Sequence, residues 1–390
     1  MGWSRSSNLE VLRIVAMLAI VGNHLAVHGA IPINSLTEPL DFKYWFAQAL
    51  ACGGKFGADV FVLISGYFLV GCKPKISGLA KLWLRMVAIG LMAVGLSVGC
   101  GGALRSGDVW RAVFPLTHNV HWFMTDYACL LLASPFLARL LRSLTRRQHL
   151  FLLAVFFVPY CALPSLLAFP GYAGRPYFDF SPFVWFLYLY CLAAYVRLHM
   201  DPAAIRLRCS LSAFAVSAGL VFGCVYGCDW LVRHGYPGWK WQVFRDMNGF
   251  FVLAAAFSLF LTFAQIRLGV HPWINWIAAG TMGVYLIHDN YLVRPLLWRK
   301  WLGVADLYRN DPEFAFKAMA AVFLVFVGCV LADAVIALVV RLVCRLAAPV
   351  LDGADDWYAR AFHDGTPGLR MNLPCPSDRG RAVSDSAMAS

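Results

Sequence analysis

Apolar segments of about 20 residues recur along almost the whole chain, and this feature constrains the fold more than any other. A helix that spans a bilayer needs about 20 mostly apolar residues. Ten such segments occur in the 390-residue sequence, at residues 9–27, 46–70, 82–104, 122–141, 150–169, 183–198, 211–232, 250–266, 273–297 and 318–346. The sequence therefore predicts an all-α fold, a polytopic integral membrane helical bundle of about ten transmembrane helices.

The composition agrees with a membrane protein and excludes two other classes. Hydrophobic residues make up 60% of the chain and charged residues only 14%. A soluble domain is about 45–50% apolar and about 25% charged, and a disordered chain is more polar still. Glu10 and Arg13 interrupt the start of the first apolar segment, so we expect a retained helix rather than a cleaved signal peptide. After a transmembrane domain over residues 1–350, the polar residues 351–390 are predicted to form a flexible tail.

Positive charge is concentrated in alternate loops and predicts the orientation of the chain. Lysine and arginine gather in the cytoplasmic loops of membrane proteins. The loops after the second, fourth and sixth predicted helices are basic and carry Lys73, Lys75, Lys81, Arg85, Arg139, Arg142, Arg146, Arg147, Arg197, Arg206 and Arg208. The basic loop after the ninth helix departs from this pattern. We expect a multi-pass protein of the cell membrane with both termini in the cytoplasm, and we expect no nucleic-acid partner despite the net charge of +12.

The cysteine pattern argues against two kinds of site. The 12 cysteines are scattered, mostly within apolar segments, and no CxxC pair occurs. Closely spaced cysteine pairs are typical of disulfide frameworks and zinc sites. The sequence therefore indicates neither a disulfide framework nor a metal site.

Polar residues inside the predicted membrane helices are candidates for function, because an ionisable group costs several kcal/mol there. They are Arg13, His24, Asp59, Ser65, His121, Asp126, His288, Asp289, Asn290 and Asp333. With the N-terminus inside, the ionisable groups other than Arg13 and Asp333 fall in the outer half of the membrane. We therefore expect them to line a polar chamber that opens outward, together with Ser65 and Asn290.

The spacing of Arg13 and His24 is the most informative. The two residues are 11 positions apart on one predicted helix. Eleven residues turn a helix to within roughly 20° of the same face and rise about 16 Å. One stripe of the helix therefore carries a cation near the inner surface and an imidazole toward the outer one. The cation suits a ligand that bears phosphate, and a neutral imidazole suits proton abstraction from a hydroxyl group.

Four groups of residues together resemble a known family. They are NLEVLR at 8–13 with Asn23-His24, FVLISGYFL at 61–69, HWF at 121–123 with SPFL at 134–137, and GVYLIH at 283–288. With the predicted ten helices, they resemble the acyltransferase-3 family, polytopic membrane enzymes that acylate cell-surface glycans. The resemblance covers about residues 8–347.

The resemblance implies an O-acyltransferase reaction. The donor would be cytoplasmic acyl-CoA, most often acetyl-CoA, which is a substrate and not a permanently bound cofactor. The acceptor would be a hydroxyl group of a surface polysaccharide, an exopolysaccharide or its lipid-linked precursor. The implied partners are the bilayer, the donor, the glycan acceptor and the polysaccharide biosynthesis machinery.

The family's functional residues map onto matching positions. Its essential histidine maps onto His24 and its essential arginine onto Arg13. Many members carry Arg-x-x-Arg in the first cytoplasmic loop to hold the donor. Here Arg85 fits that motif well, and Lys81 stands in for the other arginine.

Several alternatives stay open at this point. His24 could act as a general base or carry the acyl group itself. Asp59 or Asp289 could orient His24, and His288 could be a second acid or base or a structural hydrogen-bond partner. A transporter or flippase in glycan export would also use intramembrane Asp and His, and a family member without catalysis is a further alternative.

Overall fold

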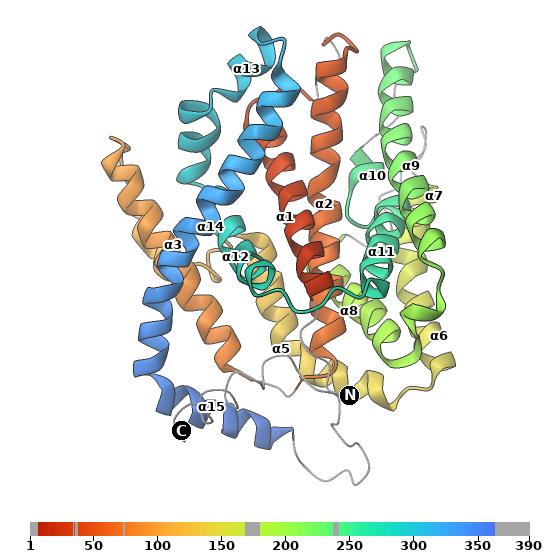
Figure 1. The fold of residues 1–390 in the computed structure, drawn as a ribbon, viewed down its shortest axis with the longest axis vertical. Helices are drawn as coiled ribbons and strands as arrows, with labels where there is room; N and C mark the ends of the chain where they lie inside the picture. The colour runs from red at the N-terminus through yellow and green to blue at the C-terminus, as the bar shows by residue number, and fades with distance from the viewer. Residues whose placement is uncertain are drawn as a thin grey trace.

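All regular secondary structure in the described part of the chain is helical (Figure 1). This computed structural model describes residues 7–362, apart from residues 34, 36–37, 73–74, 168–179 and 237–241. The all-α prediction is confirmed for these residues.

Each of the ten predicted spans contains a helix. Seven of the helices in the described residues are long and apolar enough to cross a membrane. They are α1 (Ser7–His28), α2 (Phe42–Leu69), α3 (Ser77–Gly99), α5 (Trp122–Ser143), α6 (Arg146–Phe157) with its continuation to Leu166, α9 (Leu207–Arg233) and α14 (Phe314–Leu346). The other three are shorter: α8 (Pro182–His199), α11 (Phe250–Gln265) and α12 (Pro272–His288). The protein is therefore a polytopic membrane bundle.

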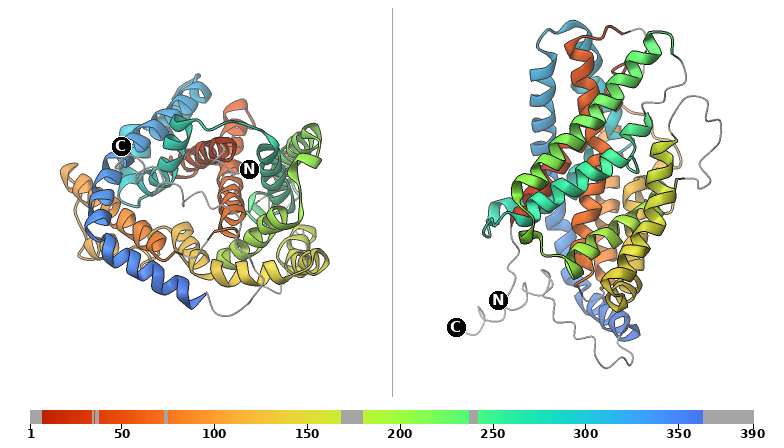
Figure 2. Two further views of the ribbon diagram at one scale, coloured as in Figure 1. Left: turned by 60° about the horizontal axis from the view of Figure 1, so that its bottom comes forward. Right: turned by 90° about the vertical axis from the view of Figure 1, so that its right-hand side faces the viewer.

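Helices α1 and α2 form the centre of the bundle, and α12 and α14 pack against the other side of α1 (Figures 1 and 2). Their close approach depends on glycines of α2 that face α1. A Cβ atom added at Gly57 would lie 2.8 Å from the carbonyl oxygen of Ala16, and one at Gly53 would lie 2.9 Å from that of Ala19. Only glycine lets the two backbones come this close.

Two predicted spans are interrupted. The fifth continues from α6 into a π-helix, η1 (Val158–Ala162), and then α7 (Leu163–Leu166). Pro159 and Pro164 lie in this stretch, and proline removes a backbone donor and so changes the hydrogen-bond pattern.

The ninth predicted span ends earlier than expected. Helix α12 stops at His288, and a π-helix, η3 (Pro295–Trp301), follows after a break. The side chain of Asn290 accepts a hydrogen bond from the backbone N–H of Leu292 at 3.0 Å, which favours a turn over continued helix. Asp289 and Asn290 therefore lie at a helix end and not inside a continuous span, which corrects the predicted boundary at residue 297.

Shorter helices connect the spans. They are α4 (Asp108–Val113), η2 (Pro202–Ala204), α10 (Gln242–Arg245) and α13 (Val304–Asn310). A further helix, α15 (Ala348–Ala361), lies where the sequence predicts a flexible tail to begin. Asp355 of α15 accepts hydrogen bonds from the backbone N–H and the hydroxyl of Ser77, both at 2.7 Å, at the start of α3. The tail is thus helical as far as Ala361, and residues 363–390 lie outside the described part.

Candidate active site

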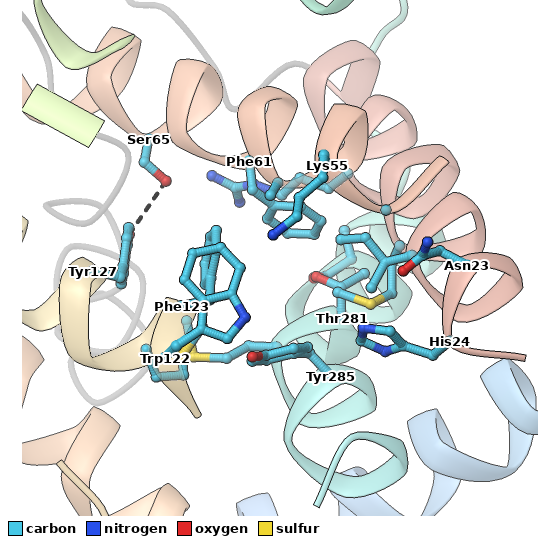
Figure 3. Close-up of a pocket in the computed structure, with 18 of the residues that line it drawn as sticks. Asn23, His24, Lys55, Phe61, Ser65, Trp122, Phe123, Tyr127, Thr281 and Tyr285 are labelled. Atoms are coloured by element: carbon cyan, nitrogen blue, oxygen red, sulfur yellow. Dashed lines mark hydrogen bonds between the residues drawn. The ribbon is translucent and has the colours of Figure 1, made fainter. Parts of the chain in front are cut away.

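A cavity of about 380 Å³ lies inside the bundle, between α1, α2, α3, α5 and α12 (Figure 3). Arg13 and His24 of α1 both line it. The shared stripe that their spacing predicts therefore faces one cavity. One space therefore contains both His24, the expected base, and Arg13, the expected phosphate-binding cation.

The cavity wall is aromatic and carries only positive formal charge. The aromatic residues come from α2, α5 and α12 and are Phe61, Trp122, Phe123, Tyr127 and Tyr285. The described lining residues include three cations, Arg13, Lys55 and Arg85, and no carboxylate. Such a wall suits a ligand that combines apolar parts with anionic groups.

His24 is held by a second histidine. Its Nδ1 lies 2.8 Å from Nε2 of His288, and Nδ1 of His288 lies 2.5 Å from the carbonyl oxygen of Val284. A carbonyl oxygen can only accept, so in neutral His288 the proton is on Nδ1, and Nε2 accepts. His24 must then donate from Nδ1, which leaves its Nε2 unprotonated. His288 is fully buried on α12 and reaches His24 without lining the cavity.

A buried carboxylate lies beside this histidine pair. Oδ1 of Asp289 is 3.6 Å from Nδ1 of His24, 3.4 Å from Nε2 of His28 and 3.0 Å from Nε of Arg294. The position of Asp289 at the end of α12 brings it to the C-terminal end of α1. Sequence reasoning missed His28 and Arg294. The i, i+4 spacing of His24 and His28 on one helix face was the available signal for the first.

The residue types of this cluster raise the question of a metal. One ligand atom each from His24, His28 and Asp289 lie within 4.8 Å of one another. However, Arg294 already contacts the same carboxylate, and its positive charge opposes a cation at that point. We therefore assign the cluster no metal.

Asp59 lies in a different environment. It is fully buried on α2, and its Oδ1 accepts a hydrogen bond from Nε1 of Trp185 on α8 at 3.0 Å. Asp289, and not Asp59, is thus the carboxylate in contact with His24. The sequence alone did not separate the two.

Of the three expected donor-binding residues, Arg13 and Arg85 line the cavity and Lys81 does not. The guanidinium of Arg85 forms a salt bridge with Asp333 of α14, and its Nη2 also donates to the carbonyl oxygen of Ala279 at 3.3 Å. Lys81, one turn earlier on α3, is exposed and is not among the lining residues. The sequence had left Asp333 without a partner.

The expected single polar chamber is divided. Ser65 lines the main cavity and accepts a hydrogen bond from the hydroxyl of Tyr127 at 3.3 Å. His121 and Asn290 instead line a separate cavity of about 10 Å³. His121, which lines the small cavity, packs edge-on against Tyr285, which lines the main one, with ring centroids 5.5 Å apart. The contact of these two rings separates the two cavities. Asp126 is half-buried and lines neither cavity. The expectation that His121, Asp126, Asp289 and Asn290 line one chamber is therefore corrected.

Comparison with known proteins identifies the family of the chain. The sequence model of the acyltransferase-3 family, described as an acyltransferase domain, matches residues 6–337. No curated protein and no solved structure matches the chain. The match covers most of the chain, including all the described residues that line the main cavity. This chain belongs to the acyltransferase-3 family and is a multi-pass membrane acyltransferase.

Proposed function

We propose that the protein is an O-acyltransferase that moves an acyl group, most often acetyl, from cytoplasmic acyl-CoA to a hydroxyl group of a surface glycan, an exopolysaccharide or its lipid-linked precursor. The observation that carries the proposal is the cavity that holds Arg13 near one end of α1 and His24 near the other. Along α1 these residues are about 16 Å apart. An acyl-CoA has its phosphates and its thioester at opposite ends of the long pantetheine arm, so one bound molecule would contact both.

In this reaction, His24 acts as the general base. Its Nε2 takes the proton from the acceptor hydroxyl as the hydroxyl oxygen attacks the thioester carbonyl carbon. The carbon–sulfur bond then breaks, and the CoA thiolate leaves and takes the proton from His24, which returns the base to its neutral form. Asp289 stabilises the positive charge on the His24 ring. His288 accepts a hydrogen bond from Nδ1 of His24 and so keeps the proton on that nitrogen.

Arg13 and Arg85 would hold the phosphates of the donor. Arginine suits this role because its planar guanidinium stays charged and can form two parallel hydrogen bonds to a phosphate. In the structure, Arg13 pairs with both carboxylate oxygens of Glu10, at 3.0 and 3.2 Å, and Arg85 pairs with Asp333. A bound phosphate would exchange with or add to these partners.

We further propose a cell-membrane location with both termini in the cytoplasm, beside the polysaccharide biosynthesis machinery. Helix α15, the start of α3 and the junction of α5 and α6 lie at the same end of the bundle (Figure 1). Lys75, Arg142 and Arg146 lie in this part of the chain, which supports a cytoplasmic assignment for that end.

The test uses membranes that contain the wild-type protein, His24→Ala or His234→Ala, labelled acetyl-CoA and surface glycan from the same cells. His234 is exposed at the end of α9 and provides a matched control outside the cavity. We expect base-labile label in the glycan with the wild type and His234→Ala, and none above background with His24→Ala. Equal label in all three samples and in membranes without the protein would reject the proposal.

A second measurement separates the two roles of His24. The wild-type protein is incubated with labelled acetyl-CoA without glycan, and the denatured protein is then counted. A general base leaves the protein unlabelled. Label that is retained on the wild type and absent from His24→Ala would instead identify an acyl-histidine intermediate.

A further inference from the structure

One cation of the cavity has no role in the reaction described so far. Lys55 lies on α2, in the sequence Gly53-Gly54-Lys55, and its side chain points into the cavity (Figure 3). Its Nζ rests over the ring of Trp122, 4.7 Å from the centroid. Among the described residues, no carboxylate comes within 4.0 Å of this ammonium group. Arg13 and Arg85, in contrast, each have a carboxylate partner.

Lys55 lies at the level of His24 and not at the level of the other two cations. The backbone of α2 at Gly54 touches the side chain of Asn23, and the amide of Asn23 donates to the carbonyl oxygen of Ala51 at 2.7 Å. Asn23 immediately precedes His24, whereas Arg13 is ten residues earlier, which corresponds to about 15 Å along α1. Arg85 bonds to Ala279, nine residues before His288, which corresponds to about 13 Å along α12.

This placement separates two kinds of anion site. If the thioester of the donor lies at His24, its phosphates lie at the far end of the pantetheine arm, near Arg13 and Arg85. The phosphates of that same molecule cannot also reach Lys55. The positive charge of Lys55, on the part of α2 that packs against Asn23, is therefore available to the other substrate, the acceptor.

The surroundings of Lys55 favour an anion that arrives with a ligand. The carboxyl groups that act electrostatically on Lys55 are those of Asp246 and Asp59. Burial raises the pKa of the Asp246 carboxyl above its ordinary value, and the charges of Lys55 and Arg245 oppose this shift. Oδ1 of Asp59 accepts a hydrogen bond from Trp185, and Oδ2 has no hydrogen-bond partner among the described residues. Trp122 holds the ammonium group by a cation–π contact, which a ligand anion can replace or supplement.

On the basis of the proposed function, we propose that Lys55 binds a negatively charged group of the acceptor glycan, a carboxylate or a phosphate, close to the hydroxyl group that is acylated. The acceptor class is then an acidic sugar or a sugar phosphate, and Trp122 and Phe123 provide aromatic faces for the adjoining sugar ring. Both sources of the anion present oxygen atoms to the ammonium group, so the chemistry of recognition is the same.

The test measures acceptor kinetics with the full-length protein in membranes. Surface glycan from the same cells is first freed of existing esters by mild base and then divided into three samples. One is left untreated, one has its carboxyl groups converted to amides, and one has its phosphates removed. Each is offered to the wild type, Lys55→Gln, Lys55→Arg and Lys43→Gln at saturating acetyl-CoA. Lys43 lies at the start of α2, outside the cavity, and serves as the matched control.

We expect Lys55→Gln to raise the acceptor KM at least tenfold on the untreated glycan, while kcat stays close to wild type. Lys55→Arg should restore most of the affinity, and Lys43→Gln should behave as the wild type. With the wild type, one of the two chemical treatments should raise the acceptor KM to a similar extent and so identify the anion as carboxylate or phosphate. Lys55→Gln should no longer distinguish the treated glycan from the untreated one.

Two failures are distinguishable. If the untreated glycan gains label that depends on His24, but neither Lys55→Gln nor either treatment changes the acceptor KM, the inference about Lys55 is overturned and the proposed function stands. If no label depends on His24 with any glycan sample, the proposed function fails and the inference fails with it.

Discussion

Nδ1 of His24 lies 2.8 Å from Nε2 of His288, which in turn is fixed by the contact of its own Nδ1 with the carbonyl oxygen of Val284. The chain of contacts runs from the backbone of α12 through two imidazoles to the cavity. Because the carbonyl oxygen of Val284 can only accept, each hydrogen bond in this series has a fixed donor: Nδ1 of His288 donates to the carbonyl, and Nδ1 of His24 donates to His288. A histidine in this arrangement has its basic nitrogen preformed on the cavity side.

Replacing His288 with alanine should therefore slow the reaction without weakening donor binding. We expect kcat to fall about 10- to 100-fold, the range seen when a supporting partner of a functional histidine is removed. The KM for acetyl-CoA should change little because His288 does not line the cavity. Steady-state kinetics of acetyl transfer checks both values, with His234→Ala as the control. A rise in the donor KM at unchanged kcat would contradict the role assigned to His288.

Replacing His24 itself should have a larger effect. General-base catalysis contributes about 10²- to 10⁴-fold to a rate, so His24→Ala and His24→Gln should lower kcat by that range. The loss should also be larger than that of His288→Ala, because the base is removed and not only misoriented. Thermal unfolding of each variant in detergent shows whether the fold is intact. A folded His24→Gln protein with wild-type kcat would exclude His24 as the base.

Arg13 should act on the donor and not on the acceptor. The Arg13→Lys variant keeps the charge but loses the bidentate geometry, so we expect the KM for acetyl-CoA to rise about tenfold, equivalent to about 1.4 kcal/mol. The acceptor KM should stay within twofold of wild type. This pattern is the reverse of the one expected for Lys55→Gln, and the two variants measured side by side serve as controls for each other. A change in the acceptor KM alone would show that Arg13 binds the acceptor and would contradict its assignment to the donor.

The contact between α1 and α2 can be tested through stability. A Cβ atom at position 57 would lie 2.8 Å from the carbonyl oxygen of Ala16, so Gly57→Ala should push the helices apart and destabilise the protein by about 1–3 kcal/mol. Gly219 on α9 is a matched control, because a Cβ atom there meets nothing within 4 Å. Gly219→Ala should leave stability unchanged or raise it by up to about 1 kcal/mol. The two midpoints of thermal unfolding in detergent decide the comparison, and equal midpoints would argue against tight packing at Gly57.

The sequence predicts the helices of this fold well for a physical reason. Hydrocarbon tolerates few polar groups, so each span is a run of about 20 apolar residues that can be recognised without knowing its neighbours. The end of α12 was missed because the break depends on a local hydrogen bond between Asn290 and Leu292, inside an otherwise apolar run. The helix α15 was missed because its composition is polar and its contacts are with Ser77, more than 250 residues away in sequence.

The candidate site shows the same limit more sharply. The pairing of Arg13 and His24 could be predicted because both lie on one helix, whose period is known. The choice between Asp59 and Asp289 could not, since it depends on which helices are neighbours. Lys55 is not among the residues singled out from the sequence, because Gly53-Gly54-Lys55 matches only a fragment of a phosphate-binding loop. Its position in the cavity becomes visible only when α2 and α5 are placed together.

The two arginines of the cavity have a consequence for turnover in the cell. The phosphates of acyl-CoA are unchanged by the proposed reaction, so Arg13 and Arg85 would hold the product CoA as firmly as the substrate. Interactions that are equal before and after the chemical step lower KM but do not raise kcat. Free CoA should then compete with the donor for the same cavity. The rate of glycan acylation would follow the ratio of acetyl-CoA to CoA in the cytoplasm. The degree of acylation of the glycan would then report on the metabolic state of the cell.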